Sequence, residues 1–145
     1  MQRIITSAAI VFAGALLFTG CAAGSNDDTT AQGDDNCEIV RVAVRDVSNG
    51  AQNAVLTGTE QAALLEKLDG YSTRLDDLAA DNADNPKIAD AIAGLQEKVT
   101  AAEDYAGTLP TAPDETFEAD AEAQAAVTGD IQAAAVTVTE VCEAE

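Results

Sequence analysis

The chain has 145 residues and a formal net charge of −19, with 26 acidic residues against 7 basic ones. This length allows one domain and a short appendage, and the charge disfavours nucleic acid as a partner. The chain also has no histidine and no tryptophan, which excludes Ser-His-Asp and Cys-His catalysis and a di-metal bundle built on Glu-x-x-His motifs. We therefore expect no catalytic residue, no metal site and no cofactor.

The first element in chain order is an apolar segment. Arg3 precedes an uncharged run from Ile4 to Phe18, and polar sequence resumes by Ser25. The run has the length of the hydrophobic region of a signal peptide and is short for a membrane span, which needs about 20 residues. We predict that residues 1–20 are a cleaved signal peptide. An N-terminal transmembrane anchor is the alternative.

The apolar run ends in the sequence Phe18-Thr19-Gly20-Cys21. It resembles the lipobox of bacterial lipoproteins, in which a branched or apolar residue and two small residues precede an invariant cysteine. Phe18 stands where that family more often has leucine. The resemblance implies cleavage between Gly20 and Cys21 and a diacylglyceryl thioether on Cys21, with an N-acyl chain such as palmitate left open. Because two acyl chains anchor a protein stably, it also implies a location on the extracytoplasmic face of the cell membrane.

The next segment, residues 21–36, is polar and rich in Gly, Ser, Asp and Thr. Such a composition buries too little apolar surface to fold. We predict a flexible acidic tether that begins at the lipidated cysteine and spans roughly 20 Å on average.

The abundance of Ala, Asp and Val beside three lysines is typical of a high-GC genome such as that of an actinobacterium, and a halophile is the alternative source of such acidity.

Residues 37–145 carry apolar residues at steps of three or four, which predicts amphipathic helices. The first segment ends near Gly58, the second runs from Thr59 to Asp81, and the third begins at Asn85-Pro86, a side-chain cap followed by a proline. The fourth follows Pro113-Asp114-Glu115, with its apolar positions starting at Phe117. Short loops between consecutive helices predict an all-α, antiparallel, up-down-up-down four-helix bundle.

Two stretches permit another interpretation. Residues 40–47 and 136–141 contain alternating, β-branched sequence that is also typical of strands. We favour helices because the three-four spacing continues through both stretches, and because two isolated strands would be marginally stable. One glycine lies inside each expected helix, either at a close approach of helices or at a kink: Gly50, Gly70, Gly94 and Gly129.

The cysteines support this topology. Lipidation of Cys21 leaves Cys37 and Cys142 as an even pair, which can oxidise outside the cytoplasm. In an up-down-up-down bundle, the start of the first helix and the end of the last lie at the same end. We therefore predict a disulfide between Cys37 and Cys142 that clamps the terminal helices. A redox or metal-binding pair is the alternative.

The remaining polar residues point to no reaction. The run Asp81–Asn85 lacks the EF-hand pattern and is interpreted as a helix-capping loop rather than a Ca²⁺ site. Arg41 and Arg45 are expected to pair with acidic side chains, and Tyr71 and Tyr105 to pack in the core or at its rim.

The expected function is a non-catalytic binding module that contacts an envelope or secreted protein. The alternatives are a carrier or sensor of a small apolar ligand held between the helices and a phage-type exclusion lipoprotein.

Overall fold

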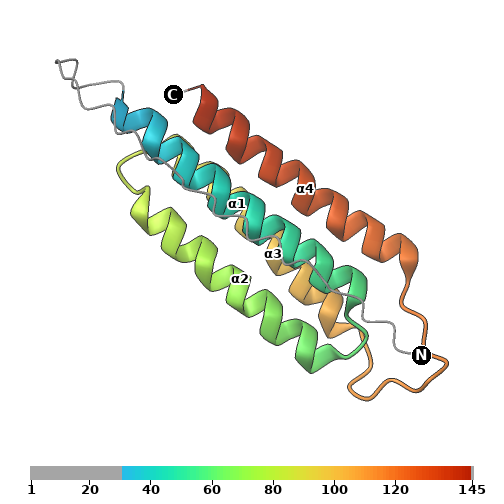
Figure 1. Ribbon diagram of the computed structural model, residues 1–145. Helices are drawn as coiled ribbons and strands as arrows, with labels where there is room; N and C mark the ends of the chain where they lie inside the picture. Colours follow the sequence, from blue (N-terminus) through green and yellow to red (C-terminus); the bar gives the residue numbers. More distant parts are fainter. Residues whose placement is uncertain (1–30, 145) are drawn as a thin grey trace, which may run out of the picture.

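The computed structural model describes residues 31–144 of the chain. Four α-helices account for most of them: α1 (Ala31–Thr57), α2 (Gln61–Asp81), α3 (Pro86–Gly107) and α4 (Ala121–Glu143). Each helix runs antiparallel to the next, and α4 returns beside α1, so every helix has two neighbours (Figure 1). This arrangement confirms the all-α four-helix bundle. Residues 40–47 and 136–141 are helical, and no strand occurs in the part of the chain that the structure describes.

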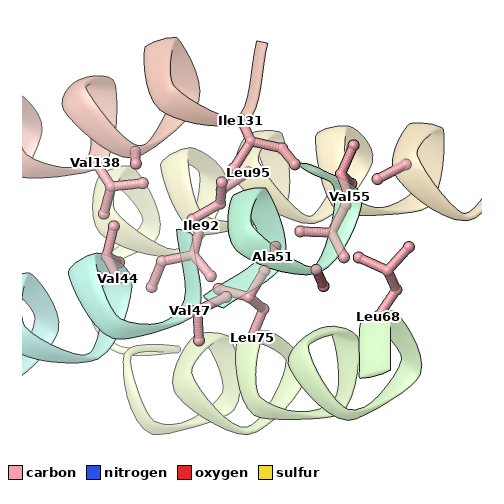
Figure 2. Close-up of a cluster of buried hydrophobic side chains, with 14 of the residues drawn as sticks. Val44, Val47, Ala51, Val55, Leu68, Leu75, Ile92, Leu95, Ile131 and Val138 are labelled. Atoms are coloured by element: carbon pink, nitrogen blue, oxygen red, sulfur yellow. The ribbon is translucent and has the colours of Figure 1, made fainter. Parts of the chain in front are cut away.

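The core lies along the bundle axis and is built from apolar residues at helical spacing. In Figure 2, side chains from all four helices point into one shared interior, among them Val47, Leu75, Ile92 and Ile131. The buried positions of each helix recur at steps of three or four, so each helix turns a single apolar face inward. The largest fully buried side chains are Leu64, Leu68, Leu75, Ile92, Leu95, Ile131, Val40, Val44, Val47, Val55, Val99 and Val138.

The first helix begins earlier than the sequence pattern predicted. α1 starts at Ala31, so residues 31–36, which were expected to belong to the tether, are helical. Asn36 lies in this added turn, and its Nδ2 donates a hydrogen bond to Oδ1 of Asn82 at 2.9 Å, which ties the turn to the end of α2. The rest of the expected tether, residues 21–30, and the expected signal peptide, residues 1–20, lie outside the described residues.

The last helix begins later than predicted, at Ala121. Its start is set by Asp120, whose Oδ1 accepts hydrogen bonds from the backbone N–H groups of Glu122 and Ala123 at 2.9 and 3.0 Å. Asp114, which we had placed just before the helix, instead holds a turn in the loop. Its Oδ1 accepts from the backbone N–H and the hydroxyl of Thr116 at 2.9 and 2.7 Å, and these bonds lower the pKa of the Asp114 carboxyl.

The interior glycines differ in what surrounds them. A methyl group at Gly50 would overlap the phenol group of Tyr71, so α1 and α2 meet closely at this point. No heavy atom of a neighbouring side chain lies within 4 Å of a methyl group placed at Gly70, Gly94 or Gly129. Close approach of helices, one of the alternatives for these glycines, therefore occurs at Gly50 alone among the four.

This difference gives a paired prediction for the substitution of glycine by alanine. Gly70→Ala should raise the free energy of unfolding by about 0.5–1 kcal/mol, because alanine has the higher helix propensity and the new methyl group meets nothing. Gly50→Ala should not give that gain, because the Tyr71 ring has to move. Urea denaturation of both variants measures the difference, and an equal gain in both would contradict the packing of Tyr71 on Gly50.

Candidate functional site

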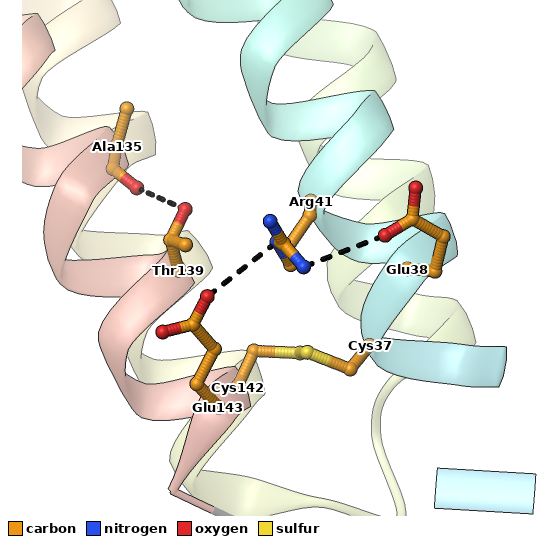
Figure 3. Close-up of polar contacts among 7 residues, drawn as sticks. All are labelled: Cys37, Glu38, Arg41, Ala135, Thr139, Cys142 and Glu143. Atoms are coloured by element: carbon orange, nitrogen blue, oxygen red, sulfur yellow. Dashed lines mark hydrogen bonds and ion pairs between the residues drawn. A yellow bond between two sulfur atoms is a disulfide. The ribbon is translucent and has the colours of Figure 1, made fainter. Parts of the chain in front are cut away.

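The cysteine pair lies where the topology placed it. Cys37 near the start of α1 and Cys142 in the last turn of α4 form a disulfide, with 5.5 Å between their Cα atoms (Figure 3). The disulfide closes one end of the bundle and joins the first and last helices, as predicted. Gly20 and Cys21, the predicted cleavage and lipidation site, lie outside the described residues, and their roles stay predictions.

Arginine side chains line α1 beside this disulfide. Arg41 pairs with Glu38 at 3.5 Å and reaches across to Glu143 of α4 at 3.8 Å (Figure 3). Arg45 pairs with its neighbour Asp46 at 3.3 Å. All of these groups are exposed, so each pair contributes about 0–1 kcal/mol at most. The expected pairing of both arginines with acidic side chains is confirmed.

The run Asp81–Asn85 lies at the α2–α3 connection, as predicted. Asn82 is buried, and its Nδ2 donates to the carbonyl oxygen of Leu78 at 2.7 Å. Asn85 caps α3, since its Oδ1 accepts from the backbone N–H of Ile88 at 3.4 Å. Across residues 36–144, whose side chains the structure describes, no group of three or more Cys, Asp or Glu residues is arranged to hold a metal ion.

An acidic cluster lies where α2 faces α3. Partial burial, together with the nearby carboxylates of Asp69 and Asp104, raises the pKa of Glu103. A carboxyl whose pKa is higher in the folded state than in the unfolded state destabilises the fold once it ionises. Its unfavourable contribution is therefore present at neutral pH, decreases as the pH falls through the folded-state pKa, and is gone below the unfolded-state pKa.

Glu103→Gln should accordingly stabilise the protein at pH 7 and have no stabilising effect near pH 3, where the native carboxyl is already protonated. The measurement is the urea midpoint of both proteins at the two pH values. Glu115→Gln, in the exposed loop after α3, is the matched control that removes the same charge elsewhere. An equal change for both substitutions would show that only the net charge matters.

The surface has several open hollows, some of them between neighbouring helices. One hollow, of about 220 Å³, is lined by residues of α1 and α4. Another, of about 380 Å³, is lined by residues of α3 and α4. Two more, of about 300 and 490 Å³, lie next to each other and share the side chains of Lys67 and Tyr71. The first of these two hollows is lined from both α1 and α2, and the second entirely from α2. We call them together the Tyr71 groove.

The Tyr71 groove was not found from the sequence. Lys67, Tyr71 and Arg74 occupy one face of α2, because their spacings of four and three residues match the helical repeat. Tyr71 is half-buried, whereas Lys67 and Arg74 are exposed. Tyr105 is buried in the core, where burial raises the pKa of its phenol. Of the two tyrosines, Tyr71 is therefore the one available at the surface.

No helix in the described part of the chain is both long enough and apolar enough to cross a membrane. Comparisons with protein-family models, with curated proteins and with solved structures found no match to this chain, so the candidate sites rest on its own residues.

Proposed function

We propose that this protein is a lipid-anchored helical protein of the cell envelope, held on the extracytoplasmic face of the membrane, where it acts as a non-catalytic binding module. The observation that carries the location is the disulfide between Cys37 and Cys142. Structural disulfides form and persist in oxidising compartments and are rare in the cytosol of mesophiles. The disulfide therefore supports export of the chain.

The third cysteine supports the anchor. With Cys37 and Cys142 joined, Cys21 is left unpaired in an exported chain, and it directly follows the apolar run that ends in Phe18-Thr19-Gly20. A free thiol outside the cytoplasm calls for an explanation. A diacylglyceryl thioether on Cys21 supplies one, because it consumes the thiol and attaches the chain to the membrane.

The form of the bundle supports a role in binding at its surface. Apolar side chains from all four helices fill its interior (Figure 2), and the hollows described above lie at its surface. A carrier that encloses a small apolar ligand would need space inside the bundle instead. Contact with an envelope or secreted protein, or with a ligand held in a surface groove, fits this distribution better.

Replacing Cys21 with serine tests the anchor. The Cys21→Ser chain, expressed in a bacterium with a lipoprotein pathway, should take up no radiolabelled fatty acid and should stay uncleaved or leave the membrane fraction. Its Cys37–Cys142 disulfide should still form, which serves as the control for export and folding. Wild-type cleavage, labelling and membrane association in the variant would contradict the proposal.

Cross-linking of the wild-type protein in living cells tests the binding role. We expect the anchored chain to capture one dominant envelope protein, and we expect this capture to be lost when the Cys21→Ser chain leaves the membrane fraction. Stoichiometric binding of an apolar dye by the purified chain, with no protein captured, would instead favour a carrier of small apolar ligands.

A further inference from the structure

We propose that the Tyr71 groove binds a small organic anion, in which an acid group such as a phosphate, sulfonate or carboxylate is attached to a flat apolar body. This inference rests on the proposed binding role and gives it a surface and a ligand chemistry. Three properties of the groove carry the inference: unpaired positive charge, the shape of the hollow, and a half-buried aromatic ring.

The charge of the groove is unusual for this chain. Arg41, Arg45 and Lys98 each pair with a carboxylate. Lys67 and Arg74 have no ion-pair partner within the described residues, although the chain has 26 acidic residues. They lie seven residues apart, which is about 10 Å along a helix. Two long cationic side chains thus flank one stretch of α2 and are available to an anion from solution.

The shape of the groove provides a place for that anion. Gly70 lies between the two cations in sequence, and a methyl group there would have no heavy atom within 4 Å. Gly70 is one of the residues that line the hollow of about 490 Å³, and the neighbouring hollow, lined in part by Gly50, has a volume of about 300 Å³. These volumes match sites for small molecules, which occupy roughly 300–1,000 Å³.

The ring of Tyr71 favours a ligand with a flat apolar body. Tyr71 packs against Gly50, and its ring is held there half-buried between the two hollows. An ordered ring offers stacking area at low cost in conformational entropy. Glu66 also lines the larger hollow, and its carboxylate opposes a bare inorganic anion. The apolar body is therefore needed for affinity, and the acid group for orientation.

The size of the charged patch favours a small molecule over an acidic peptide. The chain carries a net charge of −19, so an extended acidic segment would meet repulsion beyond Lys67 and Arg74. A single acid group needs only these two cations and meets a smaller part of the acidic surface. Because the groove is open, we expect a dissociation constant of about 0.1–1 mM rather than tight binding.

Fluorine NMR of the full chain tests this proposal, because the protein has two tyrosines. With 3-fluorotyrosine incorporated and the protein in a non-ionic detergent, Tyr71 and the buried Tyr105 give one resonance each, assigned with Tyr105→Phe. Titration with phenyl phosphate should shift the Tyr71 resonance saturably and leave that of Tyr105 in place. Phenol and inorganic phosphate, which carry only half of the recognised chemistry, should bind at least about fivefold more weakly.

Substitution of the cations completes the test. Lys67→Gln and Arg74→Gln should each weaken phenyl phosphate binding about two- to fivefold, whereas Lys98→Gln, on α3, should leave it unchanged. An unmoved Tyr105 resonance verifies the fold of each variant. The proposal is overturned by the absence of a saturable Tyr71 shift, by equal binding of phenyl phosphate and either control compound, or by equal effects of all three substitutions. None of these outcomes depends on lipid at Cys21, so they are distinguishable from failure of the anchor proposal.

Discussion

Replacing Cys37 and Cys142 with serine should lower the free energy of unfolding by roughly 4–5 kcal/mol. The two cysteines are 105 residues apart in sequence, so the disulfide closes a loop that contains nearly the whole bundle. In the chain-entropy account, a cross-link over such a loop removes many conformations from the unfolded state and leaves the folded state unchanged. The loss should be seen as a lower urea midpoint for the double variant than for the oxidised wild type.

Reduction of the wild-type protein gives the matched control. Dithiothreitol should lower its urea midpoint to that of the double variant and should not affect the variant itself. Cys21→Ser should keep the full stability, because Cys21 takes no part in the disulfide. If removal of the disulfide lowered the free energy of unfolding by less than about 1 kcal/mol, the stabilising role of the disulfide would be contradicted, because a loop of this length predicts a much larger loss.

Truncation of Val138 to alanine should lower the free energy of unfolding by about 2 kcal/mol, whereas truncation of Val136 should change it by less than about 0.5 kcal/mol. Val138 is fully buried at 0% exposure, and Val136 is 45% exposed. Both lie in α4, and both substitutions replace a β-branched residue with a better helix former. The difference between them therefore measures burial.

Comparison of the Val136→Ala and Val138→Ala variants also distinguishes a helix from a strand. Residues two apart lie on roughly opposite sides of a helix but on the same face of a strand. If residues 136–141 formed a strand, Val136→Ala and Val138→Ala would have similar costs. Equal urea midpoints for the two variants would contradict the helical core packing of α4.

The helix pattern was predictable because burial repeats with the helical period. Leu64, Leu68, Leu75 and Leu78 are the buried residues of α2, and their separations of three, four and seven residues are those of one helix face, which is the spacing that predicted the helix. The start of α3 was also predictable, because Asn85 and Pro86 carry a local signal that needs no tertiary contact.

The starts of α1 and α4 were predicted at the wrong residues, and the two errors have different causes. Residues 31–36 are mostly polar and have no large apolar residue at helical spacing, so the sequence pattern could not reveal this part of α1. The contact between Asn36 and Asn82 joins residues far apart in sequence. At α4, both Asp114 and Asp120 precede possible helical sequence. The Asp114 carboxylate bonds to Thr116 and closes a turn instead, and that competition is not visible in residue types.

The Tyr71 groove could be predicted only in part. The spacing of Lys67, Tyr71 and Arg74 places them on one face of α2, and this signal was present in the sequence. The contact between Tyr71 and Gly50 depends on the register of α1 against α2. Within the described residues no carboxylate pairs with Lys67 or Arg74, and this likewise depends on how neighbouring helices are rotated. Neither property is set by one helix alone.

The intact mass of the membrane-associated protein tests the central claim of a lipid-anchored, exported bundle most directly. The account predicts a chain that begins at Cys21, carries the mass of a diacylglyceryl group on that residue, and is two hydrogens lighter than its reduced form because Cys37 and Cys142 are joined. A chain that retains residues 1–20, or that has a free thiol at Cys21, would contradict the claim.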